Sequence, residues 1–197
     1  MDQVHGTPDA FGSPYRLLSG AVVPRPIAWV GTQNSEGKAN LAPYSFFNVV
    51  SADPPIVMFA PFGQGDDRKD TAVNVMETGE CVIHVVTEST VEAMNETAAT
   101  LAPDEDEFEH AGLERAPTEV VDAPRVADAR VAFECTLHDA QEVGGSMLIM
   151  AEVVHVHLDE ELLTEGKFDT EKLDAIGRLA GGWYARLSDR FELERPP

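Results

Sequence analysis

Residues 24–61 constrain the fold most, because two apolar segments in this stretch flank a run of small, polar and proline residues. The segments at 27–33 and 56–60 are typical of buried strands, and the turn residues at 34–38 predict a hairpin after the first. Between them, residues 40–45 are small enough for backbone groups to approach a flat ligand closely. A barrel corner packed by aromatic side chains is the alternative for this segment, and the sequence alone leaves both open.

The rest of the chain adds mostly strands. Apolar and alternating segments predict them, and turn residues separate them. The predicted strands lie at 81–86, 131–137 and 147–158. No GxGxxG motif follows a strand, so a Rossmann dinucleotide site is not supported. We therefore expect a mainly β fold, a β-barrel with appended helices, rather than a doubly wound sheet.

Two short helices are expected between the strands. Residues 68–77 have helical character, and Asp66 or Asp67 is expected to cap the start of that helix. Ser89 and Glu92 match the capping box of a second helix. The patterns therefore place one helix start directly after the second buried strand of the opening stretch.

The composition is strongly acidic. The chain has 14 Lys and Arg against 35 Asp and Glu, which gives a net charge of −21. Such self-repulsion destabilises a compact state unless salt screens it, and about 1 M salt shortens the Debye length to about 3 Å. We favour a halophilic protein over an ordinary acidic one. Nucleic acid is excluded as a partner, because there is no basic face to contact phosphates.

Neither membrane insertion nor secretion is expected. No apolar run approaches the roughly 18 residues of a membrane span, and the first residues lack a basic region followed by an apolar one. Cys81 and Cys135 lie in apolar segments, which favours reduced core thiols and a cytoplasmic location. We expect an irregular N-terminal arm at 1–14 and a single domain at 15–197. Within it, residues 102–124, with the acidic run from Asp104 to Glu107, are expected to form a surface loop.

The best candidate anion site is the predicted helix start at residues 68–71. A helix N-terminus offers free amide groups and the positive end of the helix dipole. Arg68 and Lys69 add positive charge, and the Thr71 hydroxyl adds a donor. The alternative is a surface Arg–Lys pair that balances neighbouring aspartates.

Three histidines are candidate metal ligands. His155 and His157 are spaced to share one face of a strand, and His84 lies in a buried strand. Zinc sites need three or four ligands, and neither cysteine belongs to a CxxC pair. We therefore expect structural histidines and no metal site. No sequence signature of acyl transfer is present either.

Several motifs, in family order over roughly residues 15–185, resemble the flavin reductase-like, flavoredoxin-type family of FMN-binding split barrels. They are GAVVPRPIA from Gly20, Gly31-Thr32, NLAPYSFFN from Asn40, Asp53-Pro54-Pro55, Arg68-Lys69-Asp70-Thr71 with Asn74, Glu107-Phe108, Ala111-Gly112-Leu113, Pro124-Arg125-Val126, Glu134-Cys135 and RLAGGWY from Arg178. Chance matches to single motifs would not line up in this order. Trp29 departs from the pattern, because a smaller apolar residue is expected there.

The resemblance implies a six-stranded antiparallel split barrel of Greek-key type, a homodimer, and FMN bound near the subunit interface. By this resemblance the flavin ring and ribityl chain would meet Thr32, Asn40, Leu41 and Ala42, and backbone groups of Ser45 and Phe46 would face the N5 and O4 edge. The phosphate would be held by Arg68, Lys69, Asp70 and Thr71, with Arg178 and Tyr184 near the cofactor.

The resemblance further implies an NAD(P)H-dependent oxidoreductase. Flavin carries the redox chemistry itself, so no catalytic side chain is required. NAD(P)H would be a transient electron donor, and free flavin or a small or metal acceptor would take the electrons. The alternative is an FMN-binding electron carrier or flavin store without NAD(P)H activity. A third possibility is a metal-binding β-barrel that uses His155 and His157.

Overall fold

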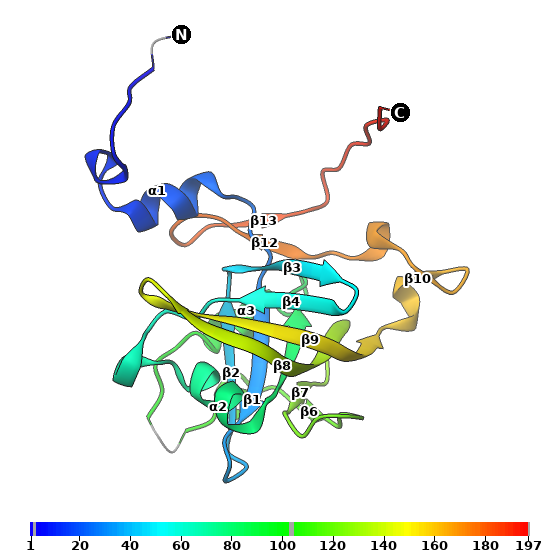
Figure 1. Ribbon diagram of the computed structural model, residues 1–197. Helices are drawn as coiled ribbons and strands as arrows, with labels where there is room; N and C mark the ends of the chain where they lie inside the picture. Colours follow the sequence, from blue (N-terminus) through cyan, green and yellow to red (C-terminus); the bar gives the residue numbers. More distant parts are fainter. Residues whose placement is uncertain (2, 103–104, 197) are drawn as a thin grey trace.

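The computed structural model describes residues 1, 3–102 and 105–196 and is built around one antiparallel sheet (Figure 1). The strand order is β2-β1-β5-β8-β9-β4-β3, so β2 and β3 are edges and the sheet is not closed. This confirms the mainly β, split-barrel expectation, with seven strands in the described sheet where six were expected. The strands are β1 Ala28–Gln33, β2 Ala39–Tyr44, β3 Phe47–Ala52, β4 Pro55–Phe59, β5 Glu80–Val85, β8 Val131–Val143 and β9 Ser146–Leu158.

The two longest strands, β8 and β9, are neighbours in the interior of the sheet. They pair from Val131 opposite Leu158 to Val143 opposite Ser146. Gly144 closes the hairpin at a φ of 58°, a conformation that favours glycine. Two shifts of register bend the β8–β9 ladder, as β-bulges do. The curved sheet can therefore wrap around a core rather than lie flat.

Side chains from both faces of the sheet are buried. One cluster includes Val75 of helix α2 (Asp70–Thr78) together with Ile83 and Phe59. A second cluster contains Trp29, which is fully buried and donates from Nε1 to Thr97 Oγ1 at 2.9 Å. The large side chain at this position therefore fills the second cluster and has a partner for its polar atom, as a buried tryptophan requires.

Both helices between the strands form, but their predicted caps are wrong. Asp66 and Asp67 lie in the 3₁₀ turn η2 (Gly65–Asp67), and Lys69 is the N-cap of α2 without a capping side-chain hydrogen bond. At α3 (Val91–Glu96) the N-cap is Thr90, so Ser89 and Glu92 form no capping box. The Ser89 hydroxyl pairs with Thr87 Oγ1 at 3.1 Å instead, because the chain turns one residue later than the pattern suggests.

The expected surface loop at 102–124 contains ordered structure. Asp106 accepts from the amides of Phe108 and Glu109 and thereby starts helix α4 (Glu107–His110). Strand β6 (Arg115–Ala116) pairs with β7 (Arg125–Val126). Four residues are too short a helix for periodicity to reveal. Asp104 of the predicted acidic run lies outside the described residues.

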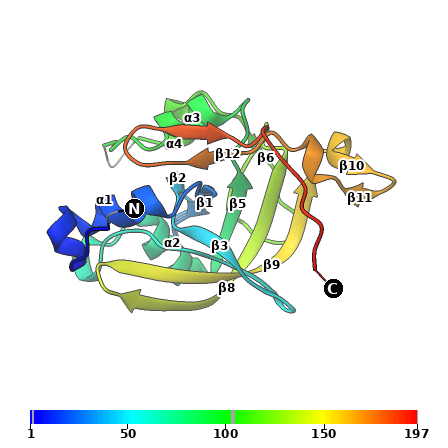
Figure 2. The same cartoon turned by 90° about the horizontal axis from the view of Figure 1, so that it is seen from above.

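The terminal segments complete the molecule. Helix α1 (Pro14–Ala21) and the hairpin of β12 (Ile176–Arg178) and β13 (Tyr184–Arg186) lie at one end of the sheet (Figures 1 and 2). The expected irregular arm includes the 3₁₀ turn η1 (Pro8–Phe11). The remaining elements are η3 Glu160–Leu162, β10 Leu163–Thr164, β11 Lys167–Phe168 and η4 Thr170–Lys172.

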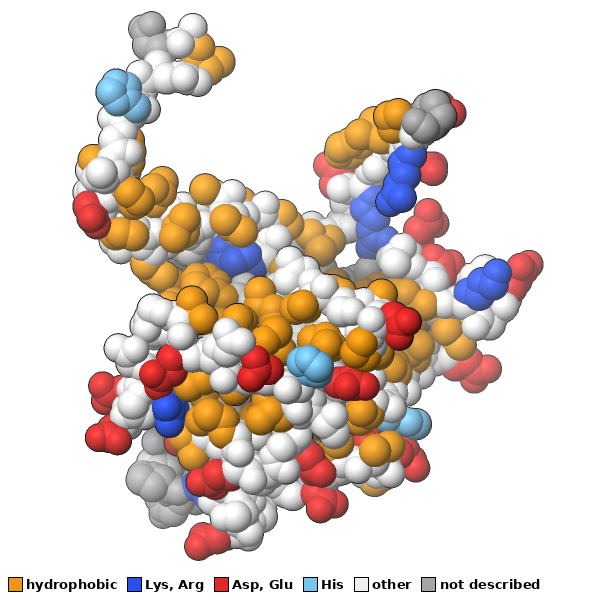
Figure 3. Space-filling model, viewed as in Figure 1, with side chains coloured by type: hydrophobic (Ala, Val, Ile, Leu, Met, Phe, Trp, Pro, Cys, Tyr) orange, Lys and Arg blue, Asp and Glu red, His pale blue; other side chains and the backbone are white. Residues whose placement is uncertain are grey.

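The surface matches the composition. Acidic side chains are spread over the face in Figure 3, and lysines and arginines are few. Among the described residues, no helix has the length and apolar character needed to cross a lipid bilayer.

Candidate functional site

A buried network of hydrogen bonds joins β1, β2 and the start of α2. Asn40 Nδ2 donates to Thr71 Oγ1 at 2.8 Å and to Thr32 Oγ1 at 3.4 Å. Asn74 Nδ2 donates to Thr32 Oγ1 at 3.1 Å, and the Tyr44 hydroxyl donates to Thr71 Oγ1 at 2.8 Å. Thr32, Asn40, Thr71 and Asn74 are all buried. The network therefore fixes the first turn of α2 against the edge strand β2.

The direction of these hydrogen bonds leaves two hydroxyl hydrogens for other acceptors. Burial raises the pKa of Tyr44 to about 12, with a smaller contribution from the nearby carboxylates Asp70 and Glu107, so Tyr44 stays protonated and donates. Thr71 Oγ1 already accepts two hydrogen bonds, and so does Thr32 Oγ1. A hydroxyl has one hydrogen to donate as well. Among the described residues, each of these two threonine hydroxyls therefore keeps one hydrogen for a further acceptor.

The start of α2 has the properties of an anion site. No side chain caps it, and the helix dipole favours negative charge there. The Ala72 amide donates to the Lys69 carbonyl at 2.9 Å, so the amides of Asp70 and Thr71 are the ones left for a ligand within the described residues. Arg68 Nη2 lies 2.7 Å from Glu142 Oε1. Within the described part of the chain, Arg68 Nε is buried and has no hydrogen-bond partner. A buried donor without a partner is costly unless a ligand accepts from it. Lys69 and Asp70 are exposed beside it.

Strand β2 is braced from its open edge by α4. The Leu41 amide donates to Glu107 Oε2 at 3.2 Å, so a side chain occupies a position that a neighbouring strand would otherwise fill. Burial raises the pKa of Glu107, and the charges of Asp106 and Asp70 add to this. Leu41 is buried, and Ala42, next along the strand, is half-exposed.

Beyond β2, Ser45 is held by a buried arginine. Arg25 is only 6% exposed and donates from Nε to Ser45 Oγ at 3.4 Å. It also donates to the carbonyls of Val22 at 2.8 Å and Leu179 at 3.0 Å, and to that of Ser19. One guanidinium thus ties the end of α1 and the C-terminal hairpin to the segment after β2. The neighbouring Phe46 packs edge-on against Phe62.

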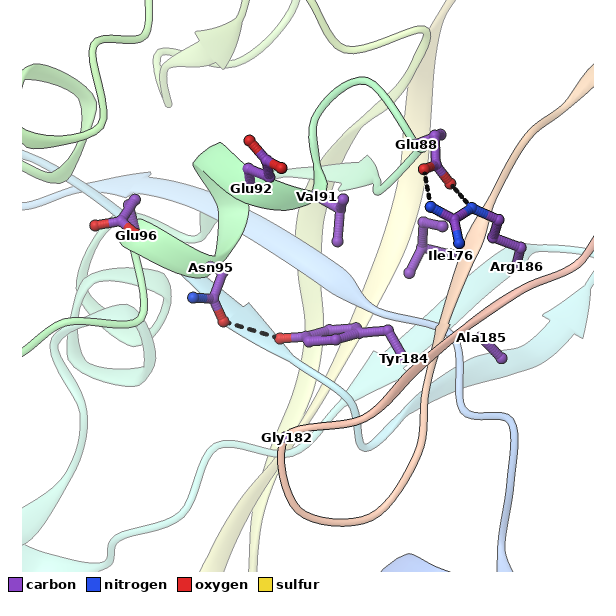
Figure 4. A pocket seen from close by; sticks show the side chains of 10 residues that line it. All are labelled: Glu88, Val91, Glu92, Asn95, Glu96, Ile176, Gly182, Tyr184, Ala185 and Arg186. Atoms are coloured by element: carbon purple, nitrogen blue, oxygen red, sulfur yellow. Dashed lines mark hydrogen bonds and ion pairs between the residues drawn. The ribbon is translucent and has the colours of Figure 1, made fainter.

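The C-terminal hairpin brings Arg178 and Tyr184 together. The Arg178 guanidinium lies 4.4 Å from the centroid of the Tyr184 ring. The Tyr184 hydroxyl donates to Asn95 Oδ1 at 3.1 Å, as Figure 4 shows. Backbone hydrogen bonds of 3.0 and 2.8 Å join Arg178 to Arg25. Because Arg25 also contacts Ser45, the hairpin is anchored next to the segment after β2.

A groove of about 480 Å³ runs between α3 and this hairpin (Figure 4). Its walls carry Glu88, Glu92 and Glu96, and of these Glu88 pairs with the Arg186 guanidinium at 2.7 Å. Carboxylates repel a phosphate group. Because of its negative charge, this groove is unsuited to a phosphate group, unlike the anion site at α2.

Some of the sequence-predicted residues are in direct contact, and others are connected through a further residue. Thr32, Asn40 and Thr71 are joined directly by hydrogen bonds, whereas Arg178 and Tyr184 reach Ser45 only through Arg25. The predicted site set omitted some residues that support it. Arg25 and Tyr44 lie within the family motifs, so their position next to predicted site residues could have indicated them. Nothing in the sequence connects Glu107 to Leu41 or Glu142 to Arg68.

Comparison with known proteins identifies relatives over almost the whole chain. Residues 19–176 match the model of the flavin reductase like domain. The uncharacterised protein YwrF of Bacillus subtilis is 43% identical over 92% of this chain and 93% of its own.

Two solved structures are also similar. Nitrilotriacetate monooxygenase component B from Bacillus cereus is 40% identical, with a TM-score of 0.91 and 98% of each chain covered. The 2-nitrobenzoate 2-nitroreductase NbaA of Pseudomonas fluorescens is 32% identical, with a TM-score of 0.89 over 99% of this chain and 96% of that one. Because the family model covers residues 19–176 and a relative 43% identical aligns over 92% of the chain, the chain belongs to the flavin reductase-like family.

Proposed function

We propose that this protein is an FMN-dependent oxidoreductase that takes electrons from NAD(P)H and passes them to free flavin or to a small or metal acceptor. The observation that carries the proposal is the Thr71 hydroxyl, which Asn40 and Tyr44 hold at the uncapped start of α2 with its hydrogen free to donate. An anion site joined in this way to a strand with small side chains suits a flavin mononucleotide, which has a phosphate at one end and a flat ring at the other.

The residues present fit the phosphate end. The Thr71 hydroxyl and the amides of the first turn of α2 would donate to phosphate oxygens, and Asp70 would contribute through its backbone. Arg68 would supply its unpaired Nε and its charge. Lys69 is exposed beside it and would add a second positive charge.

The ring end would lie along β2 and the segment after it. Thr32, Asn40, Leu41 and Ala42 would contact the ring and ribityl chain, and backbone groups of Ser45 and Phe46 would face the ring edge. Arg178 and Tyr184 would close this end from the hairpin. N–H donors in a protected site favour negative charge on a ligand, which would stabilise a reduced ring.

The chemistry would belong to the cofactor. Bound FMN would supply a ring that accepts hydride at N5 and releases electrons to an acceptor. The chain would bind and orient the two nucleotides and would need no acid, base or nucleophile of its own. The names of the relatives, a monooxygenase component and a nitroreductase, support a redox role with a small acceptor.

We also propose a cytoplasmic homodimer of single-domain chains. Large apolar side chains are exposed on α1, β3 and β9, among them Leu18 at 56% and Val49 at 68%. Exposed apolar surface of this kind marks protein interfaces. Sedimentation at micromolar concentration is expected to give twice the chain mass, and a monomer would contradict the dimer.

Anaerobic stopped-flow mixing tests the enzymatic role. Protein loaded with FMN is mixed with NADH or with NADPH, and the flavin absorption band is followed. We expect the band to bleach within seconds with at least one donor. A band that persists with both donors while FMN stays bound would identify a passive carrier or flavin store.

A further inference from the structure

Three potential metal ligands meet on β8 and β9. Glu134 on β8 pairs in register with His155 on β9, and His157 lies two residues further along. The ligand atoms of the three side chains all lie within 4.8 Å of one another. His157 Nε2 is 2.5 Å from Glu134 Oε1, and the two imidazole rings are 5.1 Å apart. Glu134 is therefore the third potential ligand, which the sequence pattern of His155 and His157 did not indicate.

The carboxylate of Glu134 is held in a fixed orientation. It is fully buried, and Oε1 accepts from the Glu119 amide at 2.7 Å. Oε2 accepts from the amides of Val120 at 2.6 Å and Val121 at 3.0 Å. A carboxylate can accept about four hydrogen bonds. Three are taken by the backbone, and the fourth acceptor position faces His157.

We propose that Glu134, His155 and His157 bind one divalent transition-metal ion of the zinc class. Two imidazoles and one carboxylate, with a water in the fourth position, are a known zinc ligand set. Imidazole selects zinc-class ions over magnesium or calcium, which prefer oxygen ligands. Backbone amides that orient a ligating carboxylate are the usual outer support of such sites.

The geometry needs only a small adjustment. Zinc bonds of about 2.0–2.2 Å place tetrahedral ligand atoms about 3.3 Å apart. The ion would replace the hydrogen bond between His157 Nε2 and Glu134 Oε1, with the ring hydrogen moving to Nδ1, and these two atoms would separate by about 1 Å. Ligand atoms that now lie up to 4.8 Å apart would approach by up to about 1.5 Å. His155 and His157 are half-exposed, so the ion can enter from solvent.

The site is independent of the proposed flavin chemistry. It uses none of the residues assigned to FMN, and it would join β9 to β8 and, through Glu134, to the loop at 119–121. Its expected role is to stabilise this end of the sheet. Binding to the folded state alone raises stability by mass action.

Equilibrium dialysis against zinc tests the site. The full-length protein, first treated with EDTA, is dialysed against micromolar ZnCl₂ and the zinc content is measured by elemental analysis. We expect one zinc per chain. His155→Ala is expected to weaken binding at least tenfold, since even outer-shell changes cost about 10- to 100-fold. Wild-type protein without bound zinc, or equal binding by His155→Ala, would overturn the proposal.

The choice of variants keeps the test independent of folding. His155→Ala leaves the His157–Glu134 pair and the backbone contacts of Glu134 in place. His138→Ala removes an exposed histidine of β8 and is the matched control, which should bind like wild type. Zinc should also raise the melting temperature of wild type and of His138→Ala but not of His155→Ala. A rise of equal size in all three would overturn the proposal.

Discussion

Thr71 Oγ1 accepts a hydrogen bond from Asn40 Nδ2 at 2.8 Å, which joins the first turn of α2 to strand β2 through two buried side chains. The contact spans 31 positions in the sequence. It makes the helix start and the strand one rigid unit. A ligand with a ring and a phosphate can therefore find both ends of its site already positioned, which lowers the ordering cost of binding.

The Thr71 hydroxyl is expected to bind the flavin phosphate. Thr71→Val should raise the Kd for FMN by about 10- to 100-fold, because a hydrogen bond to a charged group contributes about 1.5–3 kcal/mol. Fluorescence titration with FMN measures the change. Thr71→Ser keeps the hydroxyl and should bind FMN like wild type. Thr78→Ala, at the other end of α2, is the control. Unchanged FMN binding in Thr71→Val would exclude this role.

Arg68 is expected to exchange its ion pair with Glu142 for the phosphate. Arg68→Gln should raise the Kd for FMN by about tenfold at low salt. Glu142→Gln should lower it by no more than about fivefold, because an exposed ion pair is worth about 0–1 kcal/mol. Glu77→Gln removes the same charge from the far end of α2 and separates local from general electrostatics. Equal effects of the two glutamate variants would contradict the exchange.

The fold class and several segments of the candidate site could be predicted from the sequence. Apolar runs predicted β1, β4, β5 and β9, alternating apolar residues predicted β8, and the α2 start was placed within two residues. The N-caps of α2 and α3 were predicted wrongly, because the position of a cap depends on the backbone conformation of a single residue. Lys69 rather than an aspartate became the N-cap of α2, since Asp66 and Asp67 were used in a preceding turn.

Contacts between distant segments were beyond sequence reasoning. Glu107 was placed in an acidic loop, yet it accepts from Leu41 because α4 folds over the edge of β2. Glu134 belongs to a sequence motif with no sign of metal binding, and the strand register alone brings it opposite His155. Pairings of this kind are set by tertiary packing, and a single chain carries no pattern that fixes them.

The neutral state of His84 makes stability depend on pH. Its Nδ1 donates to the Trp29 carbonyl at 2.7 Å and its Nε2 accepts from the Val126 amide at 3.0 Å. Burial, aided by the nearby charges of Arg125 and His157, lowers its pKa from 6.5 to about 4. The unfolded chain therefore binds the proton first as pH falls. His84 should cost up to about 3 kcal/mol of stability between pH 6.5 and 4, and nothing above pH 6.5.

NMR titration of the His84 ring measures this directly. The ring resonances of the folded protein should stay constant down to about pH 5. The free energy of unfolding, measured with urea, should fall between about pH 6.5 and 4. Ring resonances that titrate near pH 6.5 in the folded protein would contradict the buried, neutral histidine.

The net charge of −21 is expected to make stability depend on salt. The melting temperature should rise by several degrees between about 0.1 and 2 M KCl as repulsion is screened. Replacing four exposed glutamates by glutamine should flatten this dependence, and Glu36, Glu77, Glu92 and Glu96 are suitable. A melting temperature that is independent of KCl would contradict adaptation to high salt.

Titration of the flavin-free protein with FMN and with riboflavin tests the central claim most directly. The two ligands share the ring and differ in the phosphate, so the ratio of their Kd values isolates the contribution of the α2 start. We predict one FMN per chain, bound at least tenfold more tightly than riboflavin, with the difference shrinking as salt is added. Equal affinity for the two, or no binding of either at micromolar concentration, would contradict the claim.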